Sequence, residues 1–145
     1  EAKGVRIHLP SDVVAADRFA ADAATQIVSS HAIPSGWMGL DVGPETIAAY
    51  SAVVRDAKTL LWNGPLGVFE LEAFERGTRQ LGEAIAAATE AGTLFSLVGG
   101  GDSVAAVEQF GLSERVSYVS TGGGAMLEYL EGRVLPGIQA VYDAE

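Results

Sequence analysis

LVGGGDS, at residues 97–103, joins an apolar run to a stretch of helical character through three consecutive glycines. The run, residues 93–98, is continuous rather than alternating, which is typical of a strand buried on both faces. Glycine lets a ligand approach the backbone, and a helix that starts near Asp102 or Ser103 points its free N–H groups back at the loop. The stretch therefore predicts a strand, an anion-binding loop and a helix.

The same design returns in VSTGGGA, residues 119–125, between an expected strand at 116–119 and an expected helix at 125–131. One such loop is equally consistent with a tight turn that binds nothing. Two of them at the same edge of one sheet favour phosphate as the ligand. Ser120, Thr121 and the backbone N–H groups of the second loop suit a mobile phosphoryl group.

A third loop, LWNGPLGVFE at residues 61–70, follows an expected strand at 59–62. Val68 and Phe69 suit an apolar slot for a base, and Glu70 suits hydrogen bonds from ribose hydroxyls. The residues alone favour the plainer alternative, in which Val68 and Phe69 belong to the core and Glu70 caps the next helix.

The order of elements around these loops is strand and helix in alternation. Further strands are expected at 5–9 and 37–42, and further helices at 44–57, where Pro44 and Glu45 suit a first turn, and at 73–91. Residues 11–35 form a polar, Ala-rich connection with room for another strand or a short helix. We therefore expect an α/β, Rossmann-like parallel β-sheet sandwiched by helices in three layers, with ligands at the carboxyl ends of its strands.

Asp102 stands in the first glycine loop, where a carboxylate would repel a bare phosphate. Mg²⁺ would remove that conflict, because it binds through one or two carboxylates together with phosphate oxygens. Ser103 beside it suits either a helix cap or a phosphate contact. The alternative is that Asp102 does no more than cap the helix.

The composition excludes several classes of protein. The chain has 145 residues with 9 Lys and Arg against 19 Asp and Glu, a net charge of −10, which disfavours nucleic acid and anionic membranes as partners. It has no Cys, so disulfides and thiolate metal sites are impossible, in keeping with a reducing cytosol. No apolar run reaches the roughly 18 residues of a membrane span.

The glycine loops lack cations, since no Lys or Arg lies between Leu97 and Glu114 or between Val116 and Gly132. Phosphoryl transfer needs such charge, so we expect it to come from a part of the protein outside this chain. The chain begins with Glu1, and residues 1–5 read like the end of a helix running into a strand. We therefore expect an incomplete domain that begins within a longer protein.

Four stretches in this order resemble phosphoglycerate kinases: GWMGLDVGP (36–44), LWNGPLGVFE (61–70), VGGGDS (98–103) and VSTGGGA (119–125), and LEGRVLPG (130–137) is similar as well. The resemblance implies that residues 1–145 are the C-terminal, nucleotide-binding part of such an enzyme. It implies reversible phosphoryl transfer between 1,3-bisphosphoglycerate and ADP, giving 3-phosphoglycerate and ATP in glycolysis. The N-terminal domain, which holds the glycerate with basic residues, would be absent.

The resemblance also assigns residues to the nucleotide. It implies that Gly39 and Leu40 lie against it, that Asn63 sits near its phosphates, and that Val68 lies beside the adenine. Glu70 would then bind the ribose.

At the phosphate end the resemblance implies that Gly100, Gly101 and Ser103 face the phosphates and that Asp102 holds Mg²⁺. Ser103 stands where many members of the family have Thr, and the hydroxyl is kept. The phosphoryl group in transit would be steadied by Gly122, Gly123 and Gly124.

Two other functions stay open from the sequence. One is a nucleotide-binding module without catalysis, since we expect no turnover from this chain alone. The other is a dinucleotide-dependent oxidoreductase, which the absent G-x-G-x-x-G fingerprint disfavours. We also expect the incomplete sheet to expose an edge or an apolar patch, so that the chain self-associates whereas the whole cytoplasmic enzyme is monomeric.

Overall fold

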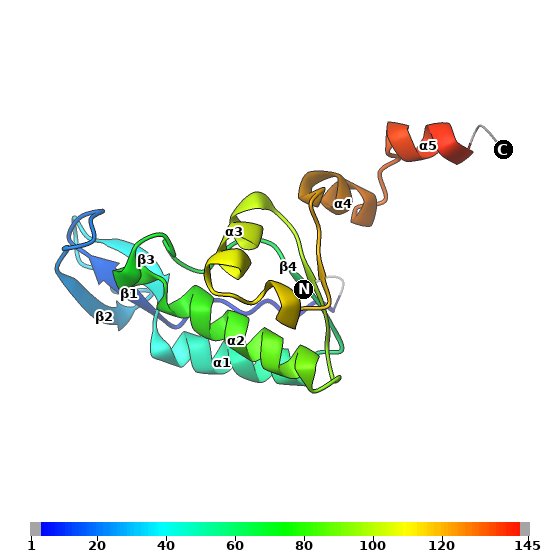
Figure 1. The fold of residues 1–145 in the computed structure, drawn as a ribbon. Helices are drawn as coiled ribbons and strands as arrows, with labels where there is room; N and C mark the ends of the chain where they lie inside the picture. The colour runs from blue at the N-terminus through cyan, green and yellow to red at the C-terminus, as the bar shows by residue number, and fades with distance from the viewer. Residues whose placement is uncertain (1–3, 143–145) are drawn as a thin grey trace.

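The computed structural model describes residues 4–142 and contains two separate sheets (Figure 1). The first is antiparallel in the order β2-β1-β3, made of β1 (Asp12–Ala16), β2 (Thr25–Ser29) and β3 (Met38–Val42). The second is parallel in the order β4-β5-β6, made of β4 (Thr59–Trp62), β5 (Phe95–Val98) and β6 (Tyr118–Val119). The parallel sheet holds the strands that precede the three loops.

Helices follow the strands as the alternation predicts. They are α1 (Pro44–Asp56), α2 (Arg76–Glu90), α3 (Gly101–Gln109), α4 (Gly123–Leu130) and α5 (Pro136–Tyr142), with short 3-10 turns at η1 (Glu72–Phe74) and η2 (Ser113–Arg115). The helix expected at 73–91 is divided, because η1 and α2 are separated at Glu75. In Figure 1, α1 and α2 lie side by side, while α4 and α5 project from the body of the molecule.

The main core lies on one face of the parallel sheet. Trp62 of β4 and Val98 of β5 are paired in register and point into it, together with Ile85 of α2 and Val107 of α3. Right-handed crossovers between parallel strands bring successive helices to the same side, which explains this arrangement. The expected α/β class, a parallel sheet flanked by helices in an incomplete domain, is therefore confirmed.

The other face of the parallel sheet is open. Leu61, Phe95 and Tyr118 project from it and keep 41%, 54% and 59% of their surface exposed. A three-layer arrangement needs helices on both faces, and within residues 4–142 they cover one. The expectation of an exposed apolar patch is confirmed.

The N-terminal part differs from the sequence prediction. Residues 5–9 form no strand, because no neighbouring strand offers them hydrogen bonds among the described residues. The connection at 11–35 contains β1 and β2. The predicted strand at 37–42 exists as β3, but it pairs antiparallel with β1, so its place in the parallel sheet was wrong. The helix end expected at the chain start falls on residues 1–3, which lie outside the described residues.

A carboxylate from β1 fixes the start of α1. Asp12 accepts hydrogen bonds from the Glu45 N–H at 3.0 Å, the Thr46 N–H at 2.8 Å and the Thr46 hydroxyl at 2.7 Å. Gly43, the N-cap residue, has no side chain to do this. Burial alone would raise the pKa of Asp12, but the hydrogen bonds from Thr46 and Glu45 outweigh it and hold the pKa below its ordinary value.

Candidate functional site

The three loops predicted from the sequence meet at the carboxyl ends of β4, β5 and β6. The ladder continues one step past the strands, since Gly99 N–H donates to the Trp62 carbonyl at 2.9 Å and Ser120 N–H to the Val98 carbonyl at 2.8 Å. Each loop therefore leaves the sheet beside its neighbour, as parallel strands require.

The two glycine loops touch through their backbones. A Cβ on Gly123 would lie 2.3 Å from the Gly100 nitrogen and 2.9 Å from its Cα, so a side chain at 123 would displace the first loop. Gly100 has φ +90°, a conformation that side-chain-bearing residues rarely adopt. Glycine is thus needed at both positions for the loops to lie together.

The loop at residues 61–70, called the Asn63 loop from here on, contacts the first glycine loop and α3. A Cβ on Gly100 would lie 2.6 Å from the Asn63 Oδ1, which places the amide directly over the first glycine loop. The Ser103 hydroxyl is fully buried and accepts a hydrogen bond from the Gly64 N–H at 2.5 Å. Ser103 therefore ties α3 to the Asn63 loop in this structure, and it makes no side-chain cap of α3.

Asp102 lies exposed in the first turn of α3, and among the described residues its carboxylate has no hydrogen-bond partner. Within that part of the chain, no group of three or more His, Cys, Asp or Glu could hold a metal ion by itself. One free carboxylate beside a glycine loop fits Mg²⁺ that shares its coordination with phosphate oxygens, and does not fit a site built from protein ligands alone.

The glycines at 122–124 open α4, the helix that follows β6. Gly122 and Gly124 are exposed, and a Cβ on either would meet no atom within 4 Å. The Met126 side chain reaches back so that a Cβ on Gly99 would lie 2.1 Å from its methyl carbon. The second loop thus contacts the first through Gly123 and Met126, and it leaves Gly122 and Gly124 exposed.

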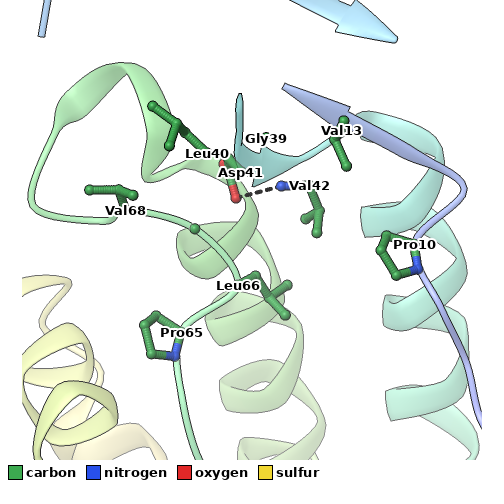
Figure 2. Close-up of a pocket in the computed structure, with 10 residues that line it drawn as sticks. Pro10, Val13, Gly39, Leu40, Asp41, Val42, Pro65, Leu66 and Val68 are labelled. Atoms are coloured by element: carbon green, nitrogen blue, oxygen red, sulfur yellow. Dashed lines mark hydrogen bonds between the residues drawn. The ribbon is translucent and has the colours of Figure 1, made fainter. Parts of the chain in front are cut away.

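A depression of about 360 Å³ is lined by residues 65–68 of the Asn63 loop, by β3 and by Pro10 and Val13. Three predicted residues, Gly39, Leu40 and Val68, line it, and the Val68 N–H donates to the Leu40 carbonyl at 2.9 Å. Figure 2 shows the Leu40 and Val68 side chains extending from two different segments toward the same side, away from Pro10 and Val42 across the depression. Leu40 belongs to the small core around Phe74, and Val68 packs against that core. The walls are largely apolar, which suits a flat ring.

Phe69 and Glu70 have different environments in the structure, one buried and one exposed. Phe69 is buried and packs edge-on to Phe110, so the core interpretation holds for it. Glu70 is exposed beyond the depression, and the helix next to it begins without a side-chain cap. Its carboxylate is therefore accessible to a ligand.

Asp41 was missed by sequence reasoning. This β3 side chain is 4% exposed and accepts hydrogen bonds from the Val42 N–H at 2.8 Å and the Gly77 N–H at 2.7 Å, at the start of α2. Burial raises its pKa, and these bonds together with the charge of Arg76 offset part of that rise. An acid inside the apolar run at 37–42 was the signal that could have found it.

No helix within the described residues is long and apolar enough to cross a membrane. The sequence model of the family described as phosphoglycerate kinase matches residues 1–133. The phosphoglycerate kinase of Chloroflexus aggregans is 60% identical over 145 residues, all of this chain and 36% of that protein. That of Rhodococcus erythropolis is 60% identical over 133 residues, which are 91% of this chain and 33% of that protein.

Solved structures agree with these relatives. The phosphoglycerate kinase of Coxiella burnetii superposes with a TM-score of 0.91 at 45% identity, over 99% of this chain and 36% of that one. That of Pyrococcus horikoshii gives 0.74 at 30% identity, over 92% of this chain and 32% of that one. The chain spans about a third of the length of these proteins. It belongs to the phosphoglycerate kinase family.

Proposed function

We propose that this chain forms the Mg-nucleotide side of a phosphoglycerate kinase, ATP:3-phosphoglycerate 1-phosphotransferase. The whole cytoplasmic enzyme would transfer a phosphoryl group between 1,3-bisphosphoglycerate and ADP, giving 3-phosphoglycerate and ATP. The observation that carries this proposal is the backbone contact of Gly100 with Gly123, which joins two phosphate-type loops into one surface.

At the phosphate end, the backbone N–H groups at the starts of α3 and α4 would face the anionic oxygens, with Gly100, Gly101 and Ser103 on one side. Asn63, lying over Gly100, would orient the chain of phosphates. Asp102 would hold Mg²⁺, whose charge neutralises the phosphate oxygens. The transferring group would be steadied by Gly122, Gly123 and Gly124.

At the base end, the apolar depression lined by Gly39, Leu40 and Val68 would take the adenine ring. The exposed carboxylate of Glu70 would accept hydrogen bonds from the ribose hydroxyls. The glycerate would be bound by an N-terminal domain that this chain does not contain. The cations that complete the transition state would come from that domain and from a lysine-bearing segment in the first part of the C-terminal domain, which this chain does not contain either.

Calorimetric titration of Mg-ADP tests this proposal. The wild type should bind, and Asp102→Asn should weaken Mg-ADP about tenfold or more, because a charged contact contributes roughly 1.5–3 kcal/mol. When a chelator removes Mg²⁺, Asp102→Asn and the wild type should bind ADP with the same affinity. Asp56→Asn, an exposed change at the far end of α1, is the matched control. Equal Mg dependence in Asp102→Asn and the wild type would refute the metal role.

A nucleotide-binding module without catalysis is the second candidate. The absence of Lys and Arg between Leu97 and Glu114 favours it for the chain alone. A coupled assay for ATP formation distinguishes the two, and we expect binding without turnover. Turnover by the isolated chain would show that no further segment is required.

A further inference from the structure

Helix α3 connects the two ends of the proposed nucleotide site. The phosphate end is formed by the glycine loops at 99–101 and 122–124, and the base end by Gly39, Leu40, Val68 and Glu70. Helix α3 begins at Gly101 and ends at Gln109, so Asp102 stands in its first turn and Gln109 is its last residue. At 1.5 Å per residue, these two are about 10 Å apart along the axis. Both ends of α3 contact the loop at 63–70.

The first contact is the hydrogen bond from the Gly64 N–H to the Ser103 hydroxyl at the start of α3. The second lies at its end, where the Gln109 Nε2 donates to the Phe69 carbonyl at 3.1 Å. Phe69 is the residue between Val68 and Glu70. The hydrogen bond from Gln109 therefore holds the backbone between Val68 and Glu70, the two residues of this loop predicted to bind the base and the ribose.

Aromatic packing reinforces the second contact. The ring of Phe110, the C-cap residue of α3, meets the ring of Phe69 edge-on, with centroids 6.2 Å apart and planes at 76°. The Arg79 guanidinium of α2 lies 4.3 Å from the centre of the Phe110 ring and is held by Glu75. The loop, α2 and α3 are thus connected at this point.

We propose that Gln109 and Phe110 are positioning residues that set the distance between the base end and the phosphate end of the site. This inference rests on the proposed function, since it concerns a ligand that occupies both ends. Neither residue touches the ligand. They act through Phe69 on the placement of Val68 and Glu70, while α3 carries Asp102 and Ser103.

The test compares a ligand that spans both ends with one that lacks a base. Gln109→Met removes the donor at similar length, and it should weaken Mg-ADP about fivefold, the worth of one typical hydrogen bond. Mg-pyrophosphate, which reaches only the phosphate end, should bind within about twofold of the wild type. Gln109→Lys retains an N–H donor and should restore the affinity for Mg-ADP. Glu108→Gln, on the neighbouring exposed residue, is the control and should change neither affinity.

Phe110→Leu tests the same role independently. It removes the contacts of the Phe110 ring with Phe69 and Arg79 and leaves the hydrogen bond from Gln109 in place. It should also lower affinity for Mg-ADP and spare Mg-pyrophosphate. Proportional loss of both ligands in the two variants would indicate a general structural role and would overturn the inference. Unchanged binding of Mg-ADP in both would overturn it as well. If the wild type failed to bind Mg-ADP, the proposed function and this inference would both be wrong.

Discussion

Gly123 lies so close to Gly100 that a Cβ on it would come within 2.3 Å of the Gly100 nitrogen. The neighbour is backbone, which cannot move aside as the end of a flexible side chain can. The contact joins the first turn of α4 to the loop before α3. It therefore makes one surface of two loops that are separate in the sequence.

Gly123→Ala should separate the two loops. A methyl group forced against backbone costs about 1–3 kcal/mol, so the variant should lose stability in urea unfolding or release α4 from the first loop. The amide NMR signals of residues 99–101 should shift in either case. Gly124→Ala is the matched control, since its Cβ meets no atom within 4 Å. It should be neutral or stabilising by up to about 1 kcal/mol, because Ala suits a helix better than Gly. Equal responses of the two variants would mean that the loops do not touch in solution.

Asp12→Ala should destabilise the chain by removing the acceptor at the start of α1. We expect a loss of about 1–3 kcal/mol in urea unfolding, as for a helix cap whose N–H partners become unpaired. Asp56→Ala, at the C-terminal end of the same helix, should cost nothing, because an acid there opposes the helix dipole. A similar loss in both variants would argue against the capping role of Asp12.

Asp12 and Asp41 should respond to pH in opposite directions. The pKa of Asp41 is raised in the folded state, so its stabilisation is full below about pH 4 and is lost as the pH rises through the raised pKa. The stability difference between the wild type and Asp41→Asn should therefore shrink with rising pH. The pKa of Asp12 is lowered, so its stabilisation is present above about pH 4 and is lost as the pH falls through the lowered pKa. The difference in unfolding free energy between the wild type and Asp12→Asn should therefore widen with rising pH.

Urea unfolding of the wild type and both variants across the pH range measures these differences. If both differences changed in the same direction with pH, the opposite pKa shifts of Asp12 and Asp41 would be contradicted.

The open face of the parallel sheet should drive self-association. Phe95 and Tyr118 leave a contiguous apolar surface beside Leu61, which favours burial against a second copy. Sedimentation should show a concentration-dependent species larger than the monomer, and Phe95→Glu should reduce it. Ile27→Glu, at an equally exposed position on β2, should have little effect. A strictly monomeric wild type would contradict this expectation.

The parallel sheet and its loops were predictable because their signals are local. Strands β4 and β5 are continuous apolar runs, and the glycines at 99–101 and 122–124 mark the turns into α3 and α4. The contact of Gly100 with Gly123 could not be predicted, because it depends on the path that each loop takes after leaving the carboxyl end of its strand.

The secondary structure of the N-terminal part was harder to predict, because it depends on which segments pair with one another as strands. Residues 5–9 alternate like a strand but have no partner strand, whereas β2 forms although nearly all of its residues are exposed. Asp12 and Asp41 cap helices that begin 32 and 35 residues later in the chain, which no local pattern reveals. Gly43, an N-cap residue without a side-chain acceptor, was the one hint that the cap of α1 comes from elsewhere.

We propose that the three loops at the carboxyl ends of β4, β5 and β6 form one nucleotide site. Titration of the isotope-labelled chain with Mg-ADP, followed through its backbone amide NMR signals, tests it most directly. We expect saturable shifts at Asn63, at residues 99–103 and at 122–124, together with shifts at Gly39, Leu40 and Val68. Saturating Mg-ADP that leaves these amides unmoved, or shifts only residues elsewhere in the chain, would contradict it.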